Sequence, residues 1–256
     1  NQASSWQASL SSGSFGFLQA VGGARLVFPD NLSVSVFSKG LVSEGNYPYT
    51  VNNGNASLKA ERKNTAIRSA QAEVSLSKLF KDSAILQFHA SSLWSERELP
   101  GAVIFFNERS SQTLDNKDQF LQVRYHNRLS GSTSLLFSGK FIDNYSRYRD
   151  PEYLNNAGGL DDIYNQQEIY FSAAVGRELG KNFSTSVSSD IALTNLKSNK
   201  NTIPRPERFS NWTNFLLAYT NSLLEVQGTL LSSFFIDKTE GERENASRFR
   251  LTPGIS

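Results

Sequence analysis

The sequence predicts an all-β protein, an antiparallel up-and-down transmembrane β-barrel. Three observations carry this prediction. Apolar and polar residues alternate over long segments, short turns alternate with long loops, and no segment shows the i, i+3, i+4 and i+7 apolar spacing of an amphipathic helix. A chain of 256 residues, 38% of them hydrophobic, is long enough to form one large domain.

Period-two alternation marks the predicted strands. It appears first at residues 32–36 and is clearest at 70–77, where Ala, Val and Leu alternate with Gln, Glu and Ser. It returns at 169–175, 183–193 and 226–230. Since successive side chains of a strand point to opposite faces, each of these segments predicts a strand with one apolar and one polar face.

Short turns and long polar loops alternate along the chain. The short turns are Pro29-Asp30-Asn31, Lys81-Asp82, Ser130-Gly131-Ser132, Gly180-Lys181-Asn182 and Thr220-Asn221-Ser222. The long loops are predicted at about 45–65, 97–116, 148–165, 197–211 and 238–246. Each interval then holds two strands of about 12 to 15 residues, against about 5 to 6 in globular sheets. Long strands with short turns on one side and long loops on the other are typical of bacterial outer-membrane barrels.

Aromatic residues lie where the predicted strands meet these turns and loops. Those beside the short turns are Phe28, Phe80, Phe183 and Tyr219, and those near the long-loop ends are Phe37, Trp94, Tyr145, Trp212 and Phe235. Aromatic residues are common at strand ends of any sheet. Combined with the asymmetry of the turns, however, these positions predict two girdles at the membrane interfaces.

Composition excludes several classes of protein. Lys and Arg number 26 against 24 Asp and Glu, so the net charge of +2 gives no field that would favour a nucleic-acid partner. The absence of cysteine excludes disulfides, a thiolate nucleophile and zinc sites built on Cys. The longest apolar run, 102–106, is far shorter than the roughly 18 residues of a spanning helix.

No catalytic motif or cofactor site is predicted. The chain lacks G-x-S-x-G, H-E-x-x-H and the P-loop, so we expect no enzyme activity. His89 and His126 alternate onto polar strand faces, where solvated side chains are a better interpretation than haem or metal ligands. Carboxylates that could hold calcium gather around one predicted loop, although without the EF-hand spacing: Asp143, Asp150, Asp161 and Asp162.

The loops supply the candidate ligand-binding residues. In these loops aromatic rings stand beside turn formers, which suits contact with a large amphipathic ligand or a partner lid. Simple packing within the loops is an equally good interpretation. The candidate residues are Tyr47, Tyr49, Phe105, Phe106, Asn107, Tyr148 and Tyr153. On a polar strand face, Arg124, His126 and Arg128 are expected to face the barrel lumen.

Four segments resemble the barrel of TonB-dependent outer-membrane receptors, particularly the vitamin B12 receptor-like branch found in Bacteroidetes. Gly13-Ser14-Phe15-Gly16 resembles the first-strand motif of that branch, and 95–103 (SERELPGAV) is similar to its E-R-G-L-P-G-A-V loop, with Glu98 where the family usually has Gly. The segment 164–170 is similar to a later strand entry, and 250–256 to the strand before the family's F-R-x-P-T-F-N-D segment. The resemblance therefore spans nearly the whole chain.

The resemblance implies a 22-stranded barrel in the outer membrane of a Gram-negative bacterium, occluded by an N-terminal plug. Such a receptor contacts outer-membrane lipid and imports a scarce nutrient, cobalamin-like or siderophore-like, when the TonB complex pulls on an N-terminal box. A surface lipoprotein lid is a further candidate partner.

Residues 1–256 show about eleven strands but no plug, TonB box or terminal aromatic strand, so we expect a partial barrel, about half of the whole and not functional alone. A passive porin-like or adhesion barrel is the first alternative. An outer-membrane hydrolase is the second.

Overall fold

The structure is a computed structural model that describes residues 3–54, 56–101, 110–153, 158–200, 205–239 and 246–255. The strands are β1 (Ser5–Ser12), β2 (Leu18–Phe28), β3 (Leu32–Ser43), β4 (Tyr47–Asn53), β5 (Ala56–Arg62), β6 (Ile67–Leu79), β7 (Ile85–Leu99), β8 (Gln112–Ser130), β9 (Thr133–Asp150), β10 (Leu160–Leu179), β11 (Phe183–Ser198), β12 (Pro206–Thr220), β13 (Glu225–Thr239) and β14 (Ala246–Ile255). A single 3-10 turn, η1 (Pro29–Asn31), joins β2 to β3. Within these ranges no helix is long and apolar enough to cross a membrane.

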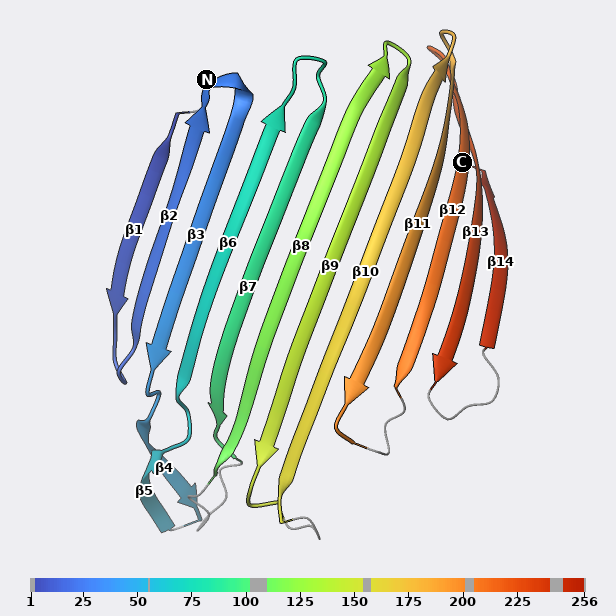
Figure 1. The fold of residues 1–256 in the computed structure, drawn as a ribbon. Coiled ribbons are helices and arrows are strands. Elements are labelled where there is room, and N and C mark those ends of the chain that lie inside the picture. Colours follow the sequence, from blue (N-terminus) through green and yellow to red (C-terminus); the bar gives the residue numbers. More distant parts are fainter. Residues whose placement is uncertain are drawn as a thin grey trace.

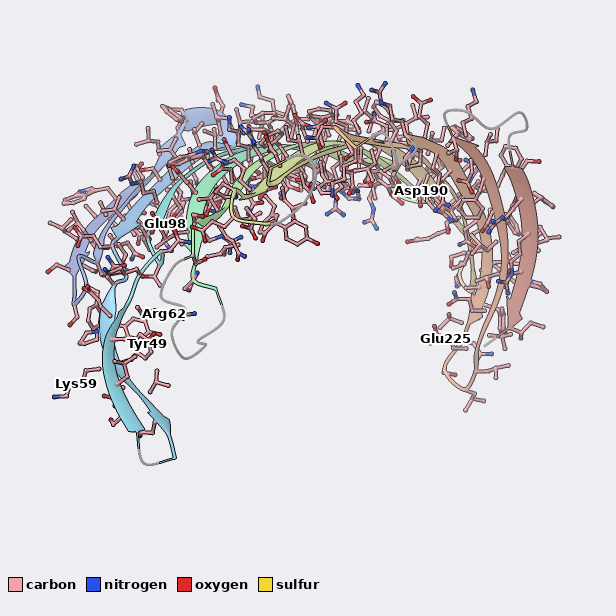
Figure 2. All side chains as sticks on the ribbon, turned by 90° about the horizontal axis from the view of Figure 1, so that it is seen from below. Tyr49, Lys59, Arg62, Glu98, Asp190 and Glu225 are labelled. Carbon is pink, nitrogen blue, oxygen red and sulfur yellow. The ribbon has the colours of Figure 1, made fainter. Side chains whose placement is uncertain are left out.

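Twelve of the strands form one antiparallel sheet in the order β1-β2-β3-β6-β7-β8-β9-β10-β11-β12-β13-β14. The predicted all-β, up-and-down fold is confirmed, and the sheet is an open arch rather than a closed barrel (Figure 2). The sequence predicts about eleven strands, one fewer than observed. The difference arises at Gly13-Ser14-Phe15-Gly16, expected in a first strand, which instead turns the chain from β1 to β2 with positive φ at Phe15 and Gly16.

The connections differ at the two ends of the sheet (Figure 1). All five predicted short turns join strands at one end, and the longer connections lie at the other. The strands run further than predicted, up to 20 residues in β10, so that the loop expected at 97–116 shrinks to 100–111. They extend because polar residues assigned to loops bond across strands, as Asp161, in the loop expected at 148–165, does with Arg147.

The two faces of the sheet differ in chemistry, as the register shows. Directly paired residues share a face, and one such row across β8 to β13 is Leu121, Phe141, Ile169, Leu193, Phe209 and Ile236. A row of opposite parity is Gln87, Arg124, Ser138, Ser172, Asp190 and Trp212. Figure 2 shows Asp190 on the concave side of the arch, so the polar face is concave and the apolar face convex.

On the convex face the apolar residues form a band. In β10 to β13 this apolar band extends from the row Ile169, Leu193, Phe209, Ile236 to the row Leu179, Phe183, Tyr219, Val226. Each strand crosses it in about 11 residues, which at the usual tilt corresponds to a height of about 25 Å. That height equals the outward apolar band of outer-membrane barrels.

Almost nothing in the described ranges covers this band. The only buried hydrophobic residues there are Ala84 and Ala192, whereas Phe171 is 60% exposed. The accessible surface is 17383 Å², against about 11,000 Å² for a compact protein of this mass. The single-layer sheet therefore has no hydrophobic core of its own.

Some of the aromatic residues expected in the two girdles lie on the convex face and others do not. Beside the short turns, Phe183 and Tyr219 lie on the convex face with ring centroids 4.8 Å apart. Trp94 and Tyr145 lie on the convex face near the long connections. Three further residues expected there lie on the concave face: Phe37, Trp212 and Phe235. Each stands an odd number of residues from the apolar convex positions of its strand. Since a shift of one residue moves a side chain to the other face of a sheet, these three rings lie on the concave face.

Candidate functional site

The predicted loop at 45–65 is a hairpin. Strands β4 and β5 form a separate two-stranded sheet that extends beyond the long-connection end of the arch (Figure 1). The chain enters it through Gly45, whose φ of 68° and close approach to the Thr65 backbone exclude a side chain. The amides of Glu44 and Gly45 both donate to the Phe15 carbonyl oxygen, so the β1–β2 turn supports the base of the hairpin.

Two of the predicted ligand-binding residues meet on this hairpin. Tyr47 and Tyr49 have ring centroids 6.5 Å apart, and Phe15 lies 6.0 Å from Tyr47 on its other side, both pairs edge to face. Tyr47 is 42% exposed. The three rings offer a partly solvated aromatic surface, which suits an amphipathic ligand.

Side-chain hydrogen bonds to backbone carbonyls join the hairpin to the end of the β7–β8 pair, and we call this set of bonds the clasp. Arg62 donates to the carbonyl oxygens of Pro100 and Gly101, and Asn64 Nδ2 donates to those of Leu99 at 2.8 Å and Gln112 at 2.9 Å. These bonds hold the hairpin and both ends of the β7–β8 loop at fixed relative positions.

Glu98, which stands where the resembling family usually has Gly, adds to this clasp. Its carboxylate accepts from the Ala66 amide at 3.0 Å, and its own amide donates to the Ala66 carbonyl. Glu98 therefore has a structural role at the base of the hairpin. Phe105, Phe106 and Asn107, predicted on the same loop, lie outside the described residues.

The remaining aromatic candidates belong to a second location. Tyr148 lies near the end of β9, paired with Asp162, and burial together with the nearby Asp150 carboxylate raises its pKa. Tyr153 is 51% exposed in the β9–β10 connection. Tyr47 and Tyr49 thus lie on the hairpin, whereas Tyr148 and Tyr153 lie at the end of β9 and in the connection that follows it.

A charged hollow of about 670 Å³ lies beside Tyr153's connection. Its polar lining residues are Ser111, Thr113, Arg149, Asp161, Asp162 and Lys200. Each cation has a carboxylate partner: Arg149 pairs with Asp115 at 3.1 Å, and Lys200 with Asp162 at 2.8 Å. These pairs neutralise the charges, so the hollow is polar without a net preference for anions.

The carboxylates that could hold calcium do not gather at one site among the described residues. Asp161 makes a two-pronged pair with Arg147, whose hydrogen bonds lower the pKa of the carboxylate. Asp143 accepts from Asn165, and Asp150 accepts from Gln112. Since the carboxylates turn to separate partners, no group of three metal-ligating side chains arises in this part of the chain.

The three residues predicted to face the lumen lie on the concave face. Arg124 is in the same register row as Asp190, and His126 lies two residues further along β8. Arg128 approaches Glu178 at 3.9 Å. His89 shares this face and bonds Ser75 through Nδ1 at 2.9 Å, with no imidazole partner.

Several residues of these sites were not predicted from the sequence. Arg62 and Asn64 act through backbone carbonyls, and Arg149 and Lys200 through carboxylates on neighbouring strands. Both kinds of contact depend on cross-strand register, which alternation alone does not reveal. The basic residues at alternate positions 147 and 149, facing acids at 115 and 161, are the signal that could have found the ion pairs.

Comparison with known proteins identifies the fold but no sequence family. No family model and no curated protein matches the chain. The crystal structure of the siderophore receptor PiuA from Acinetobacter baumannii is similar to it, with a TM-score of 0.65 at 7% sequence identity. The likeness covers 100% of this chain and 46% of that receptor.

The chain therefore has the fold of part of a siderophore-receptor barrel, and spans about half the length of that receptor. This supports the receptor-type fold implied by the sequence resemblance. It does not extend to the vitamin B12 receptor-like branch or to Bacteroidetes. The similar structure is that of a receptor.

Proposed function

We propose that the chain is part of an outer-membrane receptor that binds a scarce nutrient, siderophore-like or cobalamin-like, and imports it with energy from the TonB complex. The concave polar face, with Arg124, His126 and Arg128, would surround a plug in the lumen. Strands beyond β1 and β14 would pair the two open edges, because unpaired backbone groups are costly in hydrocarbon. A lipoprotein lid, if present, would cover the long connections.

One observation carries the membrane location. The convex face presents an apolar band about 25 Å tall, and the described residues leave it without a core to pack against. In water so large an apolar surface would drive aggregation. Lipid is the environment that matches the height of the band.

The ligand would meet the chain at the long connections. The edge-to-face rings of Phe15, Tyr47 and Tyr49 are held by the clasp of Arg62 and Asn64, so the aromatic surface is presented in one orientation. Rigid exposed aromatics lose little entropy on binding. A siderophore-like ligand, which combines an apolar body with polar edges, fits such a surface.

Uptake and binding test this proposal. The full-length protein would be produced in a host lacking its own receptors and offered a ferric catecholate, a ferric hydroxamate and cyanocobalamin. We expect one of these to be imported and bound. Tyr47→Ala combined with Tyr49→Ala should weaken binding at least 10-fold, as loss of central aromatic contacts does. Tyr125→Ala, on the convex face of β8 near the short turns, is the control and should change binding less than about 2-fold.

A protonophore separates active import from a passive pore. It should abolish uptake by the proposed receptor, whereas uptake through a porin-like barrel would continue. Uptake of none of the three ligands, or uptake insensitive to the protonophore, would contradict the proposed function.

A further inference from the structure

The hollow of about 670 Å³ at the long-connection ends of β8, β9 and β10 (Figure 1) has the size of a small-molecule site. Three of its lining residues, Thr113, Arg149 and Asp161, are direct cross-strand partners in one row on the convex face. Arg149 lies eight residues beyond Phe141 of the apolar band, which at the usual tilt is about 20 Å. The hollow therefore lies outside the hydrocarbon, and we call it the rim hollow.

The charges of the rim hollow are balanced and already paired. Each ionised side chain that lines it has an internal partner of opposite charge at 2.7 to 3.1 Å, and the pairs are Lys200 with Asp162, Asp161 with Arg147, and Arg149 with Asp115. A charged ligand would have to displace one of these partners. A neutral ligand meets no such competition.

The pair of Arg149 and Asp115 leaves one donor and one acceptor unused. Arg147 and Asp161 bond through two nitrogens and two oxygens, whereas Arg149 uses Nη2 and Asp115 uses Oδ2 in a single bond. Arg149 Nε and Asp115 Oδ1 are shielded from water and have no hydrogen-bond partner in the described structure.

Two hydroxyl groups of the rim hollow are also unused. Ser111 Oγ and Thr113 Oγ1 are buried and bond no atom in the part of the chain that the structure describes. Rotation about χ1 moves such a hydroxyl between staggered positions and can turn it into the hollow. Since buried polar groups are normally hydrogen-bonded, this set of two hydroxyls, one donor and one acceptor indicates a polar ligand.

An aromatic ring stands beside the rim hollow. Tyr153 follows the lining residue Pro151 by two positions and is 51% exposed. The hydrogen bond to Asp162 is the main cause that raises the pKa of Lys200, and Tyr153 contributes through its charge, so its side chain lies near Lys200. The exposed ring offers an apolar surface at the edge of a polar site.

We propose that the rim hollow binds a neutral saccharide. Each sugar hydroxyl both accepts and donates hydrogen bonds, so one accepts from Arg149 Nε while its neighbour donates to Asp115 Oδ1. The single bond of that ion pair lets the guanidinium swing, which exposes both atoms. Ser111 and Thr113 bond further hydroxyls, and the C–H face of the sugar lies on Tyr153. This inference goes beyond the proposed function and does not depend on which nutrient is imported.

Calorimetric titration tests the inference. The full-length protein would be refolded into a detergent without a sugar headgroup and titrated with maltotriose, cellotriose and mannotriose, which are neutral, and with trigalacturonate and triglucosamine, which are charged. We expect at least one neutral trisaccharide to bind with a Kd below about 1 mM, and both charged analogues to bind at least about 10-fold more weakly. Binding of none of the neutral probes, or equal binding of the charged ones, would overturn the inference.

The unused hydroxyls supply the decisive variant. Ser111→Ala combined with Thr113→Val removes both at nearly constant shape, and since one hydrogen bond corresponds to about a 5-fold change in affinity, binding should weaken roughly 20-fold. The variant should fold as the wild type does, because these hydroxyls make no bond in the described structure. Affinity equal to that of the wild type would contradict the proposed site.

A matched control makes the same chemical changes elsewhere. Thr50→Val combined with Ser57→Ala alters two exposed residues on the hairpin face opposite Tyr47 and Tyr49, and should leave trisaccharide binding within about 2-fold. A loss as large as that of the hydroxyl variant would assign the binding to another part of the protein and overturn the inference.

The ring of Tyr153 has its own pair of variants. Tyr153→Phe keeps the ring and should leave binding within about 2-fold, whereas Tyr153→Ala should weaken it about 5-fold. Equal affinities of the two variants would contradict stacking of the sugar on this ring.

A second arm identifies the source of the saccharide. The protein would be extracted from outer membranes, and the glycolipid that it retains counted by native mass spectrometry. Retention by the wild type but not by the hydroxyl variant would assign the site to the sugar of the surrounding glycolipid. Equal retention, beside lost trisaccharide binding, would assign it to a soluble oligosaccharide. Both results support a saccharide site.

Nutrient uptake distinguishes the two proposals. If no nutrient is imported but a neutral trisaccharide binds and the hydroxyl variant loses it, the proposed function alone is contradicted. If uptake proceeds and no neutral trisaccharide binds, only the saccharide site is contradicted.

Discussion

The apolar band and the long-connection end follow the same alternation but use the convex face differently. In the band, the convex positions of β10 are Ile169, Phe171, Ala173 and Val175, followed by Arg177 and Leu179 at the short-turn edge. Beyond it, the same face carries Asp161 and, on β9, Arg147 and Arg149, joined to carboxylates across the strands. The hydrogen-bonded ladder continues without interruption from one region to the other.

This difference shows that the ladder does not mark where a strand meets lipid. The part of a strand that meets lipid is marked instead by the change of its convex side chains from apolar to charged, because charges appear only where water can solvate them or carboxylates can pair with them. Arg177 shares the convex face at the edge of the band, one row from the short turns. Further inside, Ser189, Asn211 and Thr213 lie on the convex face and hydrogen-bond one another at 3.1 to 3.4 Å. Polar groups in the band are tolerated when they satisfy each other.

The largest effect is expected from a charge placed in the band. Val175→Arg puts a guanidinium near its middle, which should destabilise the inserted protein by about 2 to 4 kcal/mol. Gln167→Arg, on the same face of β10 just outside the band, should cost about 0 to 1 kcal/mol. Urea titration of the folded, heat-modifiable band in vesicles measures both. Equal costs at the two positions would show that the band does not mark the lipid.

Two glycine substitutions in the hairpin should have effects of intermediate size on stability. An alanine at position 45 would have to adopt positive φ, and its Cβ would clash with Thr65. An alanine at position 54, at the hairpin tip, would also have to adopt positive φ, but its Cβ would meet no other atom. Positive φ alone costs about 1 kcal/mol, and the clash should add a further 1 to 3. Amide hydrogen exchange over 47–53 reports the order of β4. Similar protection in the two variants would mean that Gly45 does not fix the hairpin.

The ion pairs beyond the band should have the smallest effect on stability, and that effect should depend on pH. Arg147 lowers the pKa of Asp161 in the folded state, so the pair stabilises the β9–β10 end fully above the unfolded value of about 3.9. That contribution is lost as pH falls through the lower folded value. Protection factors of the amides at 160–163, corrected for intrinsic exchange, should therefore decline below about pH 4.

The variant Asp161→Asn provides the control for this titration. It should show the weakened protection already at pH 7 and lose the dependence in the acid range. Retention of the same pH dependence would assign it to another carboxylate. Because the pair is exposed, the change should stay local and leave the apolar band unaffected.

Much of the fold could be predicted from the sequence because turns and alternation are local. Pro29-Asp30-Asn31 and Gly180-Lys181-Asn182 turn where their composition indicates, with Gly180 at a positive φ of 79°. The hairpin of β4 and β5 was missed because its residues alternate only weakly between Gly45 and Thr65. Its formation depends on support from Phe15 and Leu99, which are distant in sequence.

Face assignments failed where position near a strand end was taken as the guide. Trp212 and Phe235 contact each other at 5.6 Å on the concave face, although their positions near strand ends suggested a girdle. Their parity relative to Phe215 and Phe234 would have placed them correctly. The clasp and ion pairs required cross-strand register, which is set by the whole sheet and cannot be read from one strand.

Single-cysteine scanning of β10 tests the central claim most directly. Residues 1–256 contain no cysteine, so within them each label is unique, and any cysteine elsewhere in the full-length protein would be replaced by serine. Spin labels would be attached from Ile169 to Val175 in the membrane-inserted protein, and their collisions with oxygen and with a water-soluble nickel complex compared. We predict a period of two: positions 169, 171, 173 and 175 accessible to oxygen, and 170, 172 and 174 accessible to nickel. Equal accessibility at successive positions, or the opposite phase, would contradict a lipid-facing convex band.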